Sequence, residues 1–139
     1  MMGGIFVLDA CALIALLAGE SGAHKVRDII EQAIYRKILL RMNQVNLLEV
    51  YYHVAAVYDQ DVADRVIRKI REYPIEIMAG LSKAAFREAG RIKSTYKIPL
   101  GDSIAAAECV TAAGTLVTSD HTNFEKLEAA ENIAISWFR

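Results

Sequence analysis

The sequence predicts an α/β fold, with a mostly parallel sheet of four to five strands and helices on both faces. Short apolar runs alternate along the chain with segments whose apolar residues recur at helical spacing. The chain has 139 residues, of which 54% are hydrophobic, so its length suits one domain with a full core. We therefore expect a single three-layer α/β/α domain over residues 1–139.

The first half of the chain contains three apolar runs typical of strands, separated by helical patterns. Ile5–Leu8 is apolar throughout, as in a strand buried on both faces, and a helix-forming segment follows it until Gly19. A helix is then predicted by a stripe of apolar residues between about 23 and 36. The elements expected in this half cover residues 5–8, 10–17, 23–36, 38–40, 45–58, 62–72 and 74–78.

The second half repeats the alternation. Ser82 is a suitable N-cap for a helix, and Pro99-Leu100-Gly101 opposes helix continuation. We expect Asp102 to cap a following alanine-rich helix that Gly114 ends. The elements expected in this half cover residues 82–94, 102–113, 115–118, 124–130 and 133–135.

Composition and charge exclude several classes of function. The 16 basic and 17 acidic residues give a net charge of −1, so a nucleic acid would have to bind a local patch. The apolar run Val7–Ala18 contains Asp9, lacks a preceding Lys or Arg and is too short to span a bilayer. We expect a cytoplasmic protein without a membrane segment.

Cys11 and Cys109 are expected to be buried small side chains in a reducing compartment.

Four carboxylates stand where solvated acids are not expected. Asp9 follows the first strand, Asp120 follows the fourth, and Asp102 opens a helix of small residues. Each of these three also has a local explanation as a helix cap or turn residue. Glu49 caps nothing, because it lies inside an apolar helix. The carboxyl ends of parallel strands form the ligand-binding edge of such sheets, so the acids should be sought there.

Four carboxylates gathered at one edge would repel one another and raise their pKa values. A divalent cation removes this conflict, and Mg²⁺ and Mn²⁺ favour carboxylate and water oxygens. Such a site can activate water and neutralise charge on a phosphodiester. Asn46 shares the helical face of Glu49, and Thr118, Ser119 and Ser103 could hold waters nearby.

Four stretches in this order resemble the PIN-domain ribonucleases, and especially the VapC-type toxins of toxin–antitoxin pairs. These stretches are VLDACALIALL, NLLEVYY, PLGDSIAAAECV and LVTSDHTNFEKL, and together they span nearly the whole chain. The resemblance implies a PIN-like α/β/α fold and a divalent-metal-dependent endoribonuclease using one or two Mg²⁺ or Mn²⁺ ions. It also implies hydrolysis that leaves 5′-phosphate and 3′-hydroxyl ends.

Matched by position, four residues of this sequence correspond to the family's four acids. They are Asp9, Glu49, Asp102 and Asp120. The resemblance makes Asp9 and Asp102 metal ligands, with the other two acting directly or through water. Thr118 and Ser119 match the family's small polar residues before the last acid, and Asn46 matches one before the Glu. The Thr, Ser or Asn usual after the first Asp is replaced here by Ala10-Cys11.

The resemblance also implies an RNA substrate, a small antitoxin partner and a homodimer, without identifying the RNA target. For the RNA backbone, Lys83, Arg87 and Arg91 recur at i+4 steps and could form a basic stripe, or simply a solvated helix surface. An alternative to an enzyme is a catalytically silent PIN-like module that binds RNA or protein. A phosphoacceptor domain would need paired acids after the first strand and a Lys after the last, which this sequence lacks.

Overall fold

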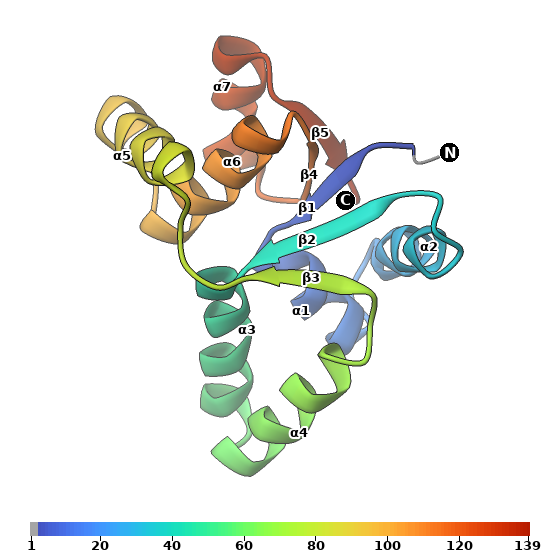
Figure 1. The fold of residues 1–139 in the computed structure, drawn as a ribbon. Helices are drawn as coiled ribbons and strands as arrows, with labels where there is room; N and C mark the ends of the chain where they lie inside the picture. The colour runs from blue at the N-terminus through green and yellow to red at the C-terminus, as the bar shows by residue number, and fades with distance from the viewer. Residues whose placement is uncertain (1–2) are drawn as a thin grey trace.

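The computed structural model describes residues 3–139 and shows a five-stranded sheet between two layers of helices (Figure 1). All neighbouring strands pair in parallel, in the order β3-β2-β1-β4-β5. The strands are β1 (Ile5–Leu8), β2 (Leu39–Asn43), β3 (Ile75–Met78), β4 (Thr115–Thr118) and β5 (Ala134–Trp137). The predicted α/β class is therefore confirmed.

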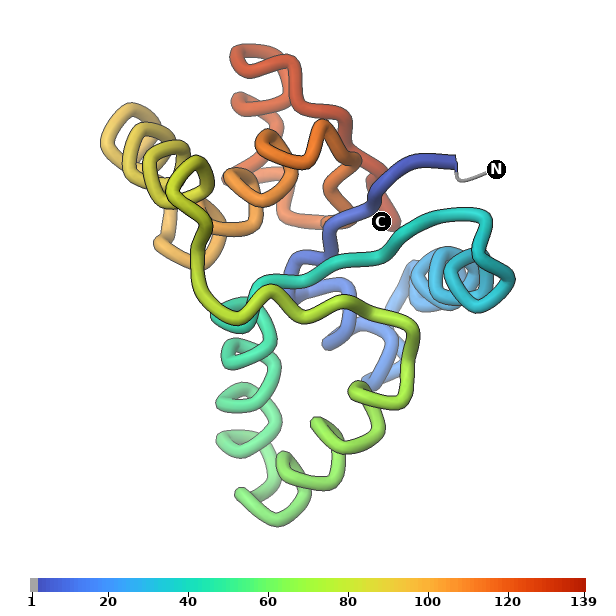
Figure 2. Tube along the Cα trace, in the orientation of Figure 1, coloured from blue at the N-terminus to red at the C-terminus, as the bar shows by residue number. Residues whose placement is uncertain are grey.

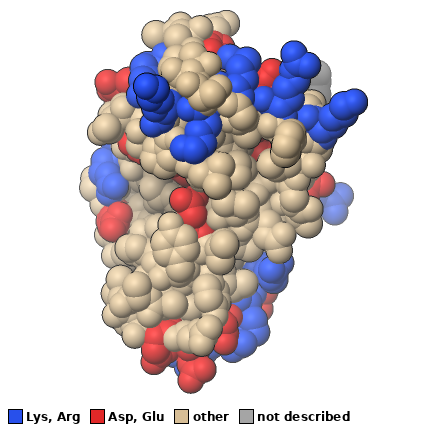
Figure 3. All heavy atoms as spheres, turned by 90° about the vertical axis from the view of Figure 1, so that its left-hand side faces the viewer, with Lys and Arg blue, Asp and Glu red and all other residues tan. Residues whose placement is uncertain are grey.

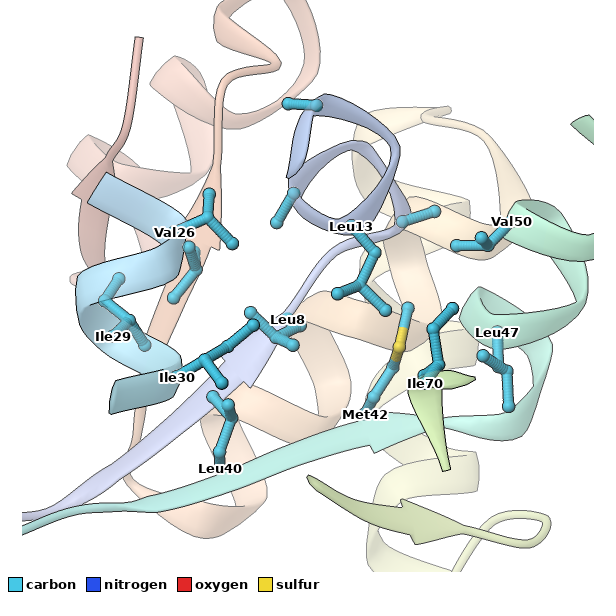
Figure 4. Packing of buried hydrophobic residues seen from close by; sticks show 14 of the residues in the cluster. Leu8, Leu13, Val26, Ile29, Ile30, Leu40, Met42, Leu47, Val50 and Ile70 are labelled. Atoms are coloured by element: carbon cyan, nitrogen blue, oxygen red, sulfur yellow. The ribbon is translucent and has the colours of Figure 1, made fainter. Parts of the chain in front are cut away.

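Seven helices cover the two faces of the sheet. They are α1 (Ala10–Ala18), α2 (Ala23–Ile34), α3 (Gln44–Val57), α4 (Gln60–Ile70), α5 (Lys83–Tyr96), α6 (Leu100–Ala112) and α7 (His121–Glu131). Helices α1 to α4 pack on one face around Leu8, Leu40 and Met42, as Figure 4 shows. Helices α5 to α7 cover the other face, where Val7 and Leu116 are buried. In Figure 2, α3 and α4 form a hairpin that projects away from the sheet.

The topology creates a crevice beside β1. The chain leaves β1 through α1 and α2 on one face, whereas β4 is reached through α5 and α6 on the other. The order of the strands therefore reverses between β1 and β4, which pair directly. Ligands of open α/β sheets bind outside the carboxyl ends of strands at this kind of reversal. Asp9 directly follows one of these two ends and Ser119-Asp120 follows the other.

The prediction that Asp102 caps its helix is wrong. Helix α6 already begins at Leu100, with Pro99 in the N-cap position and no side-chain cap. Proline restricts its own φ to a value compatible with a helix start, and the Ser103 N–H donates to the Pro99 carbonyl at 3.0 Å. Asp102 consequently lies within the first turn, where its side chain is available for other contacts.

Several other element boundaries shift by a few residues, and at two of them charged residues take part in regular structure. Strand β2 continues past residue 40 to Asn43, since Arg41 lies opposite Glu76 on β3 and bonds to it at 2.6 Å. Helix α7 begins at His121 rather than 124, because the Asp120 carboxylate accepts the Asn123 N–H at 3.2 Å. Across residues 3–139, none of the helices has the length and apolar character needed to cross a membrane.

Candidate active site

The four acids lie around one surface pocket. Asp9, Glu49, Asp102 and Asp120 line it together with Cys11 and the side chains Ile14, Tyr52 and His53. Each acid comes from a different element: the end of β1, the middle of α3, the first turn of α6 and the loop after β4. Elements from both faces of the sheet therefore meet at this pocket, as expected at the strand reversal between β1 and β4.

Asp9 is buried and held by three donors. The Ala10 N–H donates to Oδ1 at 2.8 Å, so Asp9 is also the cap of α1. The Thr118 hydroxyl donates to Oδ2 at 2.9 Å, and the Cys11 thiol donates to the same oxygen at 3.3 Å. Burial raises the pKa of Asp9 to about 6, although these hydrogen bonds oppose the rise.

Asp102 carries a buried oxygen without a partner. The residue is 8% exposed, and its Oδ2 has no hydrogen-bond partner among the described residues. Burial, followed by the charge of Asp9 and a hydrogen bond with Asp120, raises the pKa of Asp102 to about 8. Burial alone would raise the pKa of Asp120 as well, but hydrogen bonds from Asn123 and Asp102 lower it. Burial therefore disfavours the charged form most strongly at Asp9 and Asp102.

Glu49 is fixed by Asn46 and by the absence of a side chain at Gly101. Asn46 is buried, and its Nδ2 donates to Glu49 Oε1 at 2.9 Å and to the Gly101 carbonyl at 3.0 Å. A Cβ at Gly101 would lie 2.6 Å from Glu49 Cδ, so the carboxylate occupies the space that a larger residue would fill. Asn46 Oδ1, like Asp102 Oδ2, is buried without a partner within the described chain.

The donor set suits a hard divalent cation. Four carboxylates surround the pocket, and one buried carboxylate oxygen lacks a donor, which a Mg²⁺ or Mn²⁺ ion could compensate. Within residues 3–139, however, no three His, Cys, Asp or Glu side chains are close enough to hold one ion together. Mg²⁺ takes few protein carboxylates directly and keeps several waters, so the chemistry of the residues still fits such an ion.

The remaining candidates from the sequence have different surroundings. Ser103 is buried, and its hydroxyl donates to the Pro99 carbonyl at 3.0 Å within its own helix. Lys83 and Arg87 are exposed on α5, but Arg91 is paired with Glu88 and with Glu131, each at 2.7 Å. Figure 3 shows the side of the molecule that is on the left in Figure 1. Basic side chains gather on its upper part, where α5 lies, and acidic atoms lie near its centre.

The sequence reasoning missed the place of Cys11. It is half-buried at the edge of the core and also lines the pocket, whereas Cys109 is buried as expected, and both thiols are free. Burial and the charge of Asp9 raise the pKa of Cys11 to about 12, so the thiol stays protonated and can donate. Its position two residues after Asp9, on the first turn of α1, was the signal available in the sequence.

Comparison with known proteins places the chain in a family. The model of the PIN domain matches residues 6–130. The chain belongs to the PIN-domain family. Several solved structures share the fold of this chain, among them the following three. DNA-bound VapBC from Salmonella typhimurium is 14% identical to this chain, with a TM-score of 0.74 over all of both chains. VapBC2 from Rickettsia felis, bound to a promoter DNA fragment, is 15% identical, with a TM-score of 0.73 over 95% of this chain and 97% of the other. VapBC-1 from nontypeable Haemophilus influenzae is 17% identical, with a TM-score of 0.71 over 96% of this chain and 98% of the other.

These similarities in structure occur at low identity, so for this PIN-domain chain they establish the fold. No curated protein matches its sequence. The four acids therefore have to be assigned from their own geometry in the PIN fold.

Proposed function

We propose that this PIN-domain protein is a divalent-metal-dependent endoribonuclease that acts as the toxin of a toxin–antitoxin pair. The observation that carries the proposal is the meeting of Asp9, Glu49, Asp102 and Asp120 at one pocket, with a buried Asp102 oxygen left without a donor. Capping explains the positions of Asp9 and Asp120, but Glu49 and Asp102 cap no helix and still line the same pocket. The fold of the VapBC structures supports the same conclusion.

In this proposal, residues of the chain bind the metal ion, orient the metal ligands and contact the RNA. Asp9 and Asp102 are the residues to hold Mg²⁺ or Mn²⁺, with Glu49 and Asp120 contributing directly or through water. When bound, the ion would activate water and offset negative charge on the phosphodiester. Thr118 fixes Asp9, Asn46 fixes Glu49, and Asn123 fixes Asp120 through a 2.9 Å hydrogen bond. Lys83 and Arg87 are available to contact the RNA backbone.

The test is RNA cleavage by the purified protein with Mg²⁺ or Mn²⁺ and with EDTA. Asp9→Asn and Asp102→Asn should each reduce cleavage to background and still fold, because Asn is an equally good cap and the second change removes a buried charge. The matched control is Asp28→Asn, an exposed acid on α2 outside the pocket, which should keep full activity. Cleavage that survives both site substitutions, or that continues in EDTA, would overturn the proposal.

The proposed partners are an antitoxin and a second copy of the chain. Four large hydrophobic side chains on α3 and at its end are more than half exposed, which leaves apolar surface for a partner to cover. They are Leu48, Tyr52, Val57 and Tyr58. Expression of the protein should arrest growth, and co-expression of a short open reading frame encoded next to it should relieve the arrest. Sedimentation of the purified protein would measure whether it is a dimer.

A further inference from the structure

A chain of hydrogen bonds leads from Arg139 through two small side chains to Asp9. The Arg139 Nη2 donates to Ser119 Oγ at 3.2 Å, and Ser119 Oγ donates to Cys11 Sγ at 3.7 Å. The Cys11 thiol then donates to Asp9 Oδ2 at 3.3 Å. Every donor in this chain points toward Asp9, and a cationic group stands at its far end.

Counting protons shows why the thiol matters. Thr118 has one hydroxyl proton, which it donates to Asp9 Oδ2, while its oxygen accepts the Asp120 N–H at 3.1 Å. Cys11 Sγ lies 3.3 Å from Asp9 Oδ2 and 3.4 Å from Thr118 Oγ1, and because the carboxylate is the stronger acceptor the thiol supplies the second donor to Oδ2, while the Ala10 N–H supplies one to Oδ1. A carboxylate has about four acceptor positions, two on each oxygen. Donors from the described chain therefore fill Oδ2 and leave one position, on Oδ1, for a cation.

We propose that Cys11 is a positioning residue that fixes the Asp9 carboxylate for metal binding, supported by Ser119 and Arg139. The inference rests on the proposed function. A second observation points to a ligand in the pocket, because Asp102, which lines it together with Cys11, is 8% exposed and its Oδ2 has no partner in the described residues. The thiol thus replaces the hydroxyl or amide expected beside the first acid of this family.

The test compares Cys11→Ala, which removes the donor, with Cys11→Ser, which keeps one. Alanine is the best helix former, so loss of folding is not expected on α1. Mn²⁺ affinity, measured by calorimetry without RNA, should fall on the order of 10-fold in Cys11→Ala, as for other residues that orient metal ligands. The kcat for RNA should fall similarly with KM unchanged, and Cys11→Ser should restore both. Ser119→Ala should produce a smaller loss in the same direction.

Cys109→Ala is the matched control, because this thiol is buried in the core around α6 and donates to the Gly114 carbonyl at 3.0 Å. It should lower the melting temperature and leave Mn²⁺ affinity unchanged. The inference is overturned if Cys11→Ala keeps wild-type Mn²⁺ affinity, or if Cys11→Ser is as defective as Cys11→Ala. A wild-type protein that binds Mn²⁺ but cleaves no RNA would contradict only the proposed reaction, whereas one that binds no Mn²⁺ would contradict both.

Discussion

Uncharged residues fix the charged ones at the candidate site. Asp9 is held by Thr118 and Cys11, and Glu49 by Asn46 and the space above Gly101. The acids could be found in the sequence because a carboxylate within an apolar segment is conspicuous. Cys11 and Gly101 were not found, because a small residue beside apolar neighbours has the same appearance in a core and in a site.

Gly101→Ala should lower activity without lowering stability. A Cβ at this position would displace the Glu49 carboxylate, whereas a helical Gly→Ala change gains up to about 1 kcal/mol of helix propensity. We expect a loss of kcat on the order of 10-fold, as when a group that orients metal ligands is disturbed. RNA cleavage rates and urea unfolding would measure the two effects.

Gly90→Ala on α5 is the control for this change, because nothing lies within 4 Å of its Cβ position. It should gain similar stability at full activity. If both substitutions leave cleavage unchanged, the packing of Glu49 over Gly101 has no functional consequence.

At the scale of elements, a buried hydrogen bond joins α6 to the N-cap of α3, in addition to the bond from Asn46 to Gly101. Asn43 Nδ2 donates to Glu108 Oε2 at 3.0 Å and to the Gly80 carbonyl at 2.8 Å, while its Oδ1 caps α3 through the Val45 N–H. Asn43 is fully buried and Glu108 is 8% exposed. This contact, together with the Asn46–Gly101 hydrogen bond, holds the helices that carry Glu49 and Asp102 against each other. It joins residues 65 positions apart, so no local pattern could predict it.

Glu108→Ala should destabilise the protein by about 1.5–3 kcal/mol, because it removes a hydrogen bond to a charged group and leaves a buried donor short of a partner. Glu108→Gln keeps an acceptor of the same size and should recover most of that free energy of unfolding. Urea denaturation of both variants measures the difference. Equal losses in the two variants would show that the charge of Glu108, rather than its hydrogen bond to Asn43, is what stabilises the fold.

For the whole molecule, the gathered acids make stability depend on pH. Asp9 and Asp102 have pKa values raised from 3.8 to about 6 and about 8 in the folded state. In that range the folded protein binds more protons than the unfolded chain, so its stability decreases as pH rises. The stability that these two carboxyl groups contribute in their protonated form is fully present below their unfolded pKa of 3.8. It is lost as the pH rises through their folded pKa values of about 6 and then about 8.

The melting temperature in EDTA should therefore fall between pH values near 4 and near 8. Asp102→Asn should flatten the upper part of this profile, because the group with the higher pKa is gone. Excess Mg²⁺ should raise the melting temperature most at the alkaline end, where both carboxylates are charged. Thermal melts at several pH values check this, and a flat wild-type profile in EDTA would contradict it.

The sequence by itself determined the succession of strands and helices along the chain and which acids stand out. These features depend on local periodicity, on caps such as Ser82, and on the cost of placing a carboxylate in an apolar segment. The exact start of α6 was misjudged because proline both prevents a helix from continuing and permits one to begin.

Only the tertiary structure decided that the four acids converge. Convergence depends on the strand order β3-β2-β1-β4-β5, which brings the ends of β1 and β4 together although more than a hundred residues separate them. The tertiary structure also places Cys11 in contact with Asp9, and it pairs Arg91 with Glu88 and Glu131. Contacts between distant segments form because burying both faces of the sheet stabilises the whole fold. This stabilisation depends on many segments at once, so no single stretch of sequence predicts it.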